Sequence, residues 1–140
     1  MRDTLQEMLD GIPYVRRHGL VIEHVGPQVS VRMPDDPGNA NIAGGLHASS
    51  LYCAAETAAG VAAWCIRSDP AIIVLVRDVQ IRYPRRAAGE VHATATVTSV
   101  AGTDATVEAK VTDADGLAVL EATFSYAMRS ANGSSGTPSA

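Results

Sequence analysis

The sequence of 140 residues has few aromatic residues, no excess of basic residues and no long apolar run. Phe, Trp and Tyr together make up 4% of the chain, so we expect a core of aliphatic residues and alanine, whose small side chains let a helix lie close to a sheet. A formal net charge of −4 without a basic tract argues against binding to nucleic acid. The most apolar stretch, residues 51–66, contains Glu56 and is not typical of a membrane span.

The sequence has two cysteines, and both fall in that apolar stretch. On one helix, the spacing of Cys53 and Cys65 corresponds to a rise of about 18 Å, which is too far for a disulfide. We therefore expect two free thiols in a reducing compartment. The first 19 residues mix charged with apolar positions, unlike a signal peptide. These features predict a cytoplasmic protein.

Apolar periodicity predicts two helices and two groups of strands. Residues 3–11 have the i, i+3, i+4 spacing of a short amphipathic helix, which Gly11 and Pro13 would end. Residues 48–66 are rich in alanine and apolar on all sides, which predicts a long buried helix. Alternating or short apolar runs predict strands at six places: 20–25, 29–33, 72–83, 91–100, 106–112 and 117–128.

This order of elements predicts an α+β fold in which a long curved antiparallel sheet of five to six strands wraps the central helix. The chain shows no internal repeat, so we expect a single domain over residues 1–129. Residues 130–140 are rich in Ser, Gly and Pro and are predicted to form a disordered tail.

Glu56 is the residue of the central helix that most needs an explanation, because it is the one charged side chain between His47 and Arg67. An ionised carboxylate in an apolar interior costs several kcal/mol unless it is paired or hydrogen-bonded. One interpretation is that Glu56 bonds a neighbouring strand or faces water on an exposed flank of the helix. The other is that it lies in a functional cleft, where carboxylates with a perturbed pKa are common.

The loop before this helix contains Asn41, Gly44, Gly45 and His47. The free N–H groups at a helix N-terminus can bind an anion or a developing oxyanion, although a lone histidine such as His47 is more often a structural residue than a catalyst. No second His or Cys stands at the spacing of metal ligands, so we expect no metal site. Neither a G-x-S-x-G motif nor a Ser/His/Asp arrangement is evident.

Two groups of residues carry a resemblance to a known family. Asn41, His47 six positions later and Glu56 nine positions after that form the first group. The second is the segment VQIRYPRRAAGE at residues 79–90, which reads V-x-I-x-Y-x-R followed by G-E. Together, over residues 20–128, they resemble the hotdog-fold thioesterases of the phenylacetate-pathway (PaaI-like) type and related uncharacterised hotdog proteins of the DUF4442 type. The resemblance implies a hotdog fold and hydrolysis of acyl-CoA thioesters.

The resemblance also implies roles for individual residues. The backbone N–H of Ala48 would bind the thioester carbonyl, and Glu56 of the partner protomer would act as general base or as nucleophile. Asn41 and His47 would orient the loop, with Gly45 beside the substrate. Coenzyme A would be part of the substrate, and no separate cofactor is expected. Three arginines could contact the phosphates of coenzyme A, although solvated surface charge is the favoured interpretation of them: Arg82, Arg85 and Arg86.

Some interpretations stay open at this point. The family's His-Gly-Gly is His47-Ala48-Ser49 here, which favours the alternative of a non-catalytic module that binds acyl-CoA. A hotdog dehydratase is disfavoured because its His-Phe-Pro motif is missing, and a scaffold domain whose Glu56 seals an interface is the remaining alternative. An open sheet edge predicts at least a dimer, or a dimer of dimers. Tyr52 and Trp64 are interpreted as packing residues rather than as walls of an acyl pocket.

Overall fold

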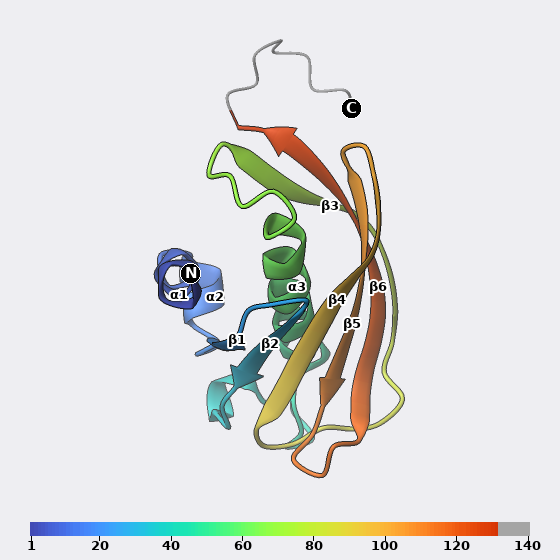
Figure 1. The fold of residues 1–140 in the computed structure, drawn as a ribbon. Coiled ribbons are helices and arrows are strands. Elements are labelled where there is room, and N and C mark those ends of the chain that lie inside the picture. The colour runs from blue at the N-terminus through green and yellow to red at the C-terminus, as the bar shows by residue number, and fades with distance from the viewer. Residues whose placement is uncertain (132–140) are drawn as a thin grey trace.

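In the second half of the chain, segments in which apolar and polar residues alternate form long antiparallel strands (Figure 1). The computed structural model describes residues 1–131. The six strands lie in the order β1-β2-β4-β5-β6-β3. Their bounds are β1 (Val21–His24), β2 (Gln28–Met33), β3 (Ile72–Arg82), β4 (Val91–Ala101), β5 (Asp104–Thr112) and β6 (Ala118–Ser130). The predicted α+β hotdog fold, with a curved sheet of this size, is confirmed.

The central helix, α3 (Ala48–Trp64), lies in the concave side of the sheet. Its alanines 54, 55, 58 and 59 are fully buried, and it contacts β2, β4, β5 and β6. Inward-facing residues of the strands, such as Val31, Val107 and Phe124, complete the core and are also fully buried. Because alanine has so small a side chain, the backbone of α3 can lie close to the sheet, as the low aromatic content predicts.

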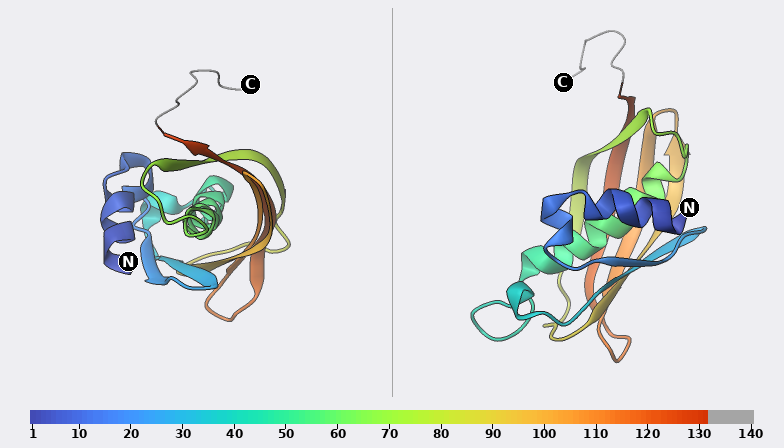
Figure 2. Two further views of the ribbon diagram at one scale, coloured as in Figure 1. Left: turned by 45° about the horizontal axis from the view of Figure 1, so that its top comes forward. Right: turned by 90° about the vertical axis from the view of Figure 1, so that its left-hand side faces the viewer.

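The N-terminal segment covers the side of α3 that the sheet leaves open (Figure 2). It forms two helices, α1 (Arg2–Asp10) and α2 (Pro13–Arg16), rather than the one helix predicted. Pro13 was expected to end helical structure, but it begins α2, because proline is well suited to the first position of a helix. A short 3-10 helix, η1 (Pro37–Asn39), follows β2 and leads toward α3.

The last described residues extend β6 beyond its predicted end. The strand continues to Ser130, and the Ala131 N–H donates a hydrogen bond to the Ala71 carbonyl. The beginning of the predicted tail is therefore strand. The remainder of that prediction, residues 132–140, lies outside the described residues. Both cysteines are free, with Cys53 buried and Cys65 half-buried.

Candidate active site

The loop that leads into α3 is organised by the side chain of Asn41. Its Oδ1 accepts hydrogen bonds from the N–H groups of Ala43 at 2.9 Å and Gly45 at 3.0 Å, and its Nδ2 donates to the Leu46 carbonyl at 3.2 Å. The Asn41 N–H also donates to the Gly45 carbonyl at 2.7 Å. These bonds engage both ends of the amide, so Asn41 holds the loop in shape.

His47 caps α3 and leaves one backbone donor free. Its Nδ1 accepts a hydrogen bond from the Ser49 N–H at 3.0 Å, and its carbonyl accepts from the N–H groups of Ser50 and Leu51. In the part of the chain that the structure describes, the Ala48 N–H is the first-turn donor with no acceptor. Ala48 is an exposed residue, and its N–H lies at the positive end of the helix dipole.

Gly45 brings the loop against the segment that follows β3. A Cβ at Gly45 would lie 2.9 Å from the Ala87 carbonyl oxygen, so no larger residue fits without a shift of the backbone. The Leu46 N–H donates to the same carbonyl at 2.7 Å, and Arg86 Nη2 donates to the Ala43 carbonyl at 3.4 Å. The loop and the guanidinium of Arg86 are therefore neighbours.

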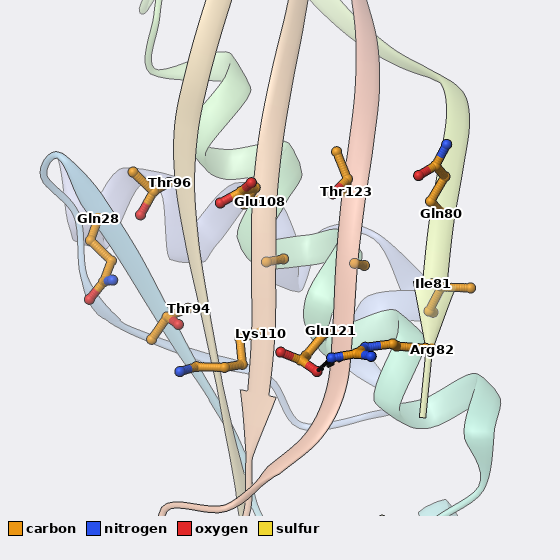
Figure 3. Close-up of a pocket in the computed structure, with 12 residues that line it drawn as sticks. Gln28, Gln80, Ile81, Arg82, Thr94, Thr96, Glu108, Lys110, Glu121 and Thr123 are labelled. Atoms are coloured by element: carbon orange, nitrogen blue, oxygen red, sulfur yellow. Dashed lines mark hydrogen bonds and ion pairs between the residues drawn. The ribbon is translucent and has the colours of Figure 1, made fainter. Parts of the chain in front are cut away.

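The arginines predicted to bind phosphates do not lie together. Arg82 forms an ion pair with Glu121 at 2.7 Å on the outer face of the sheet (Figure 3). It lines a hollow of about 600 Å³ whose walls are mainly Thr, Gln, Glu and Lys side chains. Arg85 is exposed and precedes Arg86 in the chain. The outer hollow is an open and mainly polar face of the sheet, so we place the candidate site elsewhere.

Glu56 lies midway along α3, on the side that faces the N-terminal helices. Within the described residues its carboxylate makes no hydrogen bond or ion pair, and only its backbone carbonyl is engaged, by the Tyr126 hydroxyl at 3.3 Å. Burial raises the pKa of the Glu56 carboxyl group above its usual range. Burial, followed by the charge of Glu56, likewise raises the pKa of Tyr52 and of Tyr126. A carboxylate without a cation beside it is suited to accept a proton.

Glu56 stands on the wall of a cavity of about 550 Å³ between α3 and the N-terminal segment. The α3 side of the wall consists of Glu56, Thr57, Gly60, Val61 and Trp64. The N-terminal side is entirely apolar and consists of Leu5, Met8, Leu9, Ile12 and Val15. The start of β3 closes the third side with Ile72, Ile73 and Val74. An apolar cavity of this size with one or two polar groups is typical of a site for a small ligand.

The two chemically distinctive groups of one chain do not face a common point. Ala48 and Glu56 are eight positions apart on α3, a rise of about 12 Å, whereas a hydrogen bond spans about 3 Å. The Ala48 N–H points out from the end of the helix, while Glu56 faces the cavity beneath α1. A reaction that needs both groups at one carbonyl would require the second group from another copy of the chain.

Comparison with known proteins identifies the family. Residues 4–128 match the family model described as a domain of unknown function, DUF4442. The chain belongs to the DUF4442 family. This match covers most of the sequence and confirms the resemblance that Asn41, His47, Glu56 and residues 79–90 carry. Among curated proteins, none matches the sequence.

Solved structures of the same shape include several thioesterases. A thioesterase from Haemophilus influenzae is 17% identical, with a TM-score of 0.84, and the match covers 94% of this chain and 92% of that chain. A mutant thioesterase from Pseudomonas aeruginosa is 18% identical, with a TM-score of 0.84, over 93% of this chain and 94% of that one. A Pseudomonas aeruginosa protein described as a probable thioesterase is 26% identical, with a TM-score of 0.75, over 91% and 95%. These likenesses bear out the hotdog fold of this DUF4442 protein.

Three residues of this DUF4442 protein have positions that sequence reasoning missed. Trp64, interpreted as a packing residue, lines the cavity. Thr57 lines it as well, with a side chain that is 4% exposed. The Tyr83 hydroxyl donates to the Ala48 carbonyl at 3.2 Å and so ties the end of β3 to the first turn of α3. A signal for Tyr83 was present, since it is the Tyr of the V-x-I-x-Y-x-R segment, but nothing in the sequence showed which α3 residues face a cavity.

Two further observations on this DUF4442 protein concern metal ligands and membrane-spanning helices. Within residues 1–131, no cluster of three or more His, Cys, Asp or Glu side chains is placed to hold a metal ion. No helix in the same part of the chain combines the length and apolar character needed to cross a membrane. The functional roles given above to Asn41, Gly45, His47, Ala48 and Glu56 stay predictions.

Proposed function

We propose that this protein hydrolyses acyl-CoA thioesters at a site formed by two copies of the chain. The observation that carries the proposal is the presence of two complementary groups on one helix, one at its start and one at its middle. An unpaired N–H marks the start of α3, and a carboxylate whose pKa is raised by burial lies on a cavity midway along it. Hydrolysis of a thioester needs a donor for the developing oxyanion and a base or nucleophile near the carbonyl carbon. The thioesterases of the same fold support this choice.

In the proposed reaction, the thioester oxygen accepts a hydrogen bond from the Ala48 N–H of one copy, and the dipole of α3 stabilises the negative charge. As general base, Glu56 of the other copy takes a proton from water, and the resulting hydroxide attacks the carbonyl carbon. The tetrahedral intermediate then expels the thiolate of coenzyme A, which takes up the proton from Glu56. The products are a carboxylic acid and free coenzyme A.

In a second version of this reaction, Glu56 acts as the nucleophile. Its carboxylate attacks the carbonyl carbon and forms a mixed anhydride as the thiolate leaves, and water then hydrolyses the anhydride. The two versions differ in the fate of oxygen atoms. A single turnover in ¹⁸O-labelled water followed by mass spectrometry of the protein tests the second version: ¹⁸O in the Glu56 side chain requires that water opened the anhydride at the Glu56 carbonyl, because general-base catalysis labels the product alone.

The coenzyme A part would leave the site over the loop at residues 41–47. Arg86 lies beside this loop, and Arg85 is exposed next to it in the chain, which supports the proposal that both contact phosphate groups. Arg82 is engaged with Glu121 on the other face of the sheet, so we assign it no part in binding. If these arginines contact the phosphates, we expect KM to be lower for coenzyme A esters than for short thioesters without phosphates.

The test is release of free thiol from acyl-CoA esters of short, medium and long chain length and from aromatic esters, by the wild type and by Glu56→Gln. Glutamine keeps the shape of glutamate but accepts no proton. We expect kcat to fall by about 10²–10⁴-fold, with little change in KM, because the interaction acts in the transition state. The oligomeric state is measured in parallel. Equal turnover by the two proteins would contradict the proposal.

A non-catalytic module that binds acyl-CoA is the second candidate. The observation that favours it is the methyl group of Ala48 at the entrance to the N–H, where the PaaI-like pattern has glycine. This candidate predicts that coenzyme A esters bind to the wild type, with a dissociation constant measurable by calorimetry, and that none is hydrolysed. Ala48→Gly then tests the cause, since removal of the methyl group would produce turnover if access to the N–H were limiting.

A further inference from the structure

The cavity beside Glu56 extends along α3 in one direction only. The α3 residues on its wall begin with Glu56 and end with Trp64, whereas residues 48–55 of the helix contribute nothing to it. Glu56, Gly60 and Trp64 are spaced by four residues, so they lie on one face of the helix, over a rise of about 12 Å. Glu56 thus marks one end of the α3 wall and Trp64 marks the other.

Gly60 leaves the middle of this row open. A Cβ built on it would lie 3.8 Å from the Tyr126 hydroxyl oxygen and 3.9 Å from Glu56 Oε1. These are ordinary contact distances, so alanine would fit here without displacing a neighbour. Glycine in a helix interior is less favourable than alanine, and what it provides on this wall is free space. The row on α3 therefore consists of a carboxylate, a gap and an aromatic ring.

The surfaces opposite this row are apolar. They come from the N-terminal segment, with Met8 and Ile12 among its residues, and from the start of β3. Within residues 1–131, Glu56 is the one ionisable side chain on the wall, and no cation stands there. The Thr57 hydroxyl is fully buried against the Cys53 thiol, so it adds no polar atom to the cavity surface. A ligand of this cavity must therefore be uncharged and apolar along its length.

We propose that the cavity binds the acyl chain of the substrate and that Trp64 limits the length of this chain. The inference rests on the proposed function, because it takes Glu56 to mark the position of the thioester carbon. From that carbon the chain runs past Gly60 toward Trp64. The substrate class is therefore a thioester of an unsubstituted acyl chain of medium length. Acyl groups with a charged end are excluded, because an ionised carboxylate would have no partner on this wall.

The first test measures kcat/KM for coenzyme A esters of increasing acyl length. In the wild type, kcat/KM should rise by about fourfold with each methylene up to the preferred length and no further. Trp64→Ala should move the preferred length to longer chains, whereas a loss of stability alone would lower the rates for all esters alike. The same preferred length in a folded Trp64→Ala protein would overturn the inference.

A matched control for this variant lies two residues further along the chain. Ile66 is half-buried like Trp64, but it is not on the wall of the cavity. Ile66→Ala removes a large apolar side chain from the same end of α3, and we expect the preferred length to stay as in the wild type. An equal shift in Ile66→Ala and Trp64→Ala would overturn the role of Trp64.

The opposite change is made in the middle of the row. Gly60→Leu places an aliphatic side chain in the open volume, and we expect the preferred chain length to become shorter. Gly60→Ala adds a single methyl group and should give a smaller shift in the same direction. An unchanged length profile in a folded Gly60→Leu protein would show that the acyl chain lies elsewhere and would overturn the inference.

The charge of the acyl group gives an independent test. The wild type is assayed with an ester of the preferred length and with the ester of the same length whose acyl chain ends in a carboxylate. We expect kcat/KM to be about 10²–10³-fold lower for the second ester, because its carboxylate must take up a proton to enter an apolar cavity at neutral pH. Equal values would show that the end of the chain lies in water and would overturn the inference.

Failure of the proposed function has a different outcome. If the wild type hydrolyses no ester at all, the proposed function fails, and dissociation constants from titration calorimetry replace kcat/KM in the same comparisons. A length preference that Trp64→Ala and Gly60→Leu move in opposite directions then supports the assignment of the cavity without catalysis. A preference that neither variant changes overturns it. Hydrolysis with a length preference unchanged in both variants leaves the thioesterase proposal intact and removes only the role of the cavity.

Discussion

The two edges of the sheet are built in opposite ways. At the first edge, β1 has only four residues and an irregularity between Ile22 and His24. The side chain of Gln6 lies along it, donating to the Leu20 carbonyl at 3.0 Å and accepting from the Ile22 N–H at 2.7 Å. The amide of Gln6 thus takes the place of a neighbouring strand, and α1 covers this edge.

The other edge, β3, has eleven residues and is bonded on one side only, to β6. Its exposed side chains include Ile73, Leu75 and Val76 at 43%, 47% and 38%. A long apolar edge strand without protection invites pairing with another chain. The protein thus closes one edge with its own residues, whereas the other edge is open, and the proposed two-chain site would use the open edge.

The largest expected effect comes from blocking the β3 edge. Leu75→Lys combined with Val76→Lys places two charges on it outside the cavity wall, and we expect a monomer without measurable turnover, because Ala48 and Glu56 of different copies are separated. Light scattering coupled to gel filtration, together with thiol release, measures both effects. Leu117→Lys is the matched control, since Leu117 is 44% exposed but lies in the turn before β6. An active monomer would contradict the shared site.

A smaller effect is expected from Ala48→Pro, which removes a single N–H. Proline suits the first position of a helix, and the extended conformation of His47 (φ −68, ψ 139) is the one that a following proline requires. We expect kcat to fall by about 10²–10³-fold with an unchanged Tm, whereas Ala48→Gly keeps the donor and the activity.

Mixing two inactive proteins sharpens this result. A dimer of one Ala48→Pro chain and one Glu56→Gln chain contains one doubly defective site and one intact site. Random exchange of subunits should therefore restore about a quarter of the wild-type activity, provided that each site combines residues of two chains. No recovery after complete exchange would show that each chain carries its own site.

The closed edge is tested through stability. Gln6→Ala leaves the Ile22 N–H and the Leu20 carbonyl without their partner, which should lower the free energy of unfolding by about 1–2 kcal/mol. We expect no change in oligomeric state or kcat, because the proposed dimer uses the β3 edge and not this one. Chemical denaturation measures the effect. Gln28→Ala is the control, since Gln28 is exposed and its side chain makes no hydrogen bond in the described part of the chain. Dissociation of the dimer by Gln6→Ala would contradict the assigned roles of the two edges.

The smallest expected effect is a pH dependence of stability through Glu56, whose cavity adjoins β3. Its pKa is raised in the folded state, so between the unfolded value near 4.5 and the folded value the folded protein binds more protons. The free energy of unfolding then falls as the pH rises through this window. Glu56→Gln should lack this decrease and be more stable than the wild type at neutral pH. The prediction would be refuted if the free energies of unfolding of the wild type and of Glu56→Gln changed with pH in the same way.

Much of the fold could be predicted from the sequence, because its signals are local and strong. The alternation along residues 72–83 and 91–100 gave strands whose observed ends differ by one residue. The alanine-rich segment predicted α3 and overestimated its end by two residues. The prediction that Pro13 ends helical structure was wrong, because proline can follow one helix or begin another and local sequence does not distinguish these two cases.

Less of the candidate site than of the fold could be predicted from the sequence. Asn41 and His47 act on neighbours within five residues, so their placement in one loop followed from their spacing. The cavity depends on packing between α1 and the start of β3, far apart in the sequence, which no local pattern encodes. The ion pair of Arg82 with Glu121 could not be predicted either, because it depends on the register between β3 and β6.

The pairing of β3 with β6 has a consequence for the order in which the molecule forms. The strands β4, β5 and β6 are joined by short turns and pair with their neighbours in sequence, as in Ala101 opposite Asp104. In contrast, Ile72 pairs with Ser130 and Arg82 with Glu121, so β3 must close a loop that contains the whole meander. Closure of long loops is entropically slow. We therefore expect β3 to join the sheet late in folding, so that newly made chains become competent to associate only once the rest of the sheet is in place.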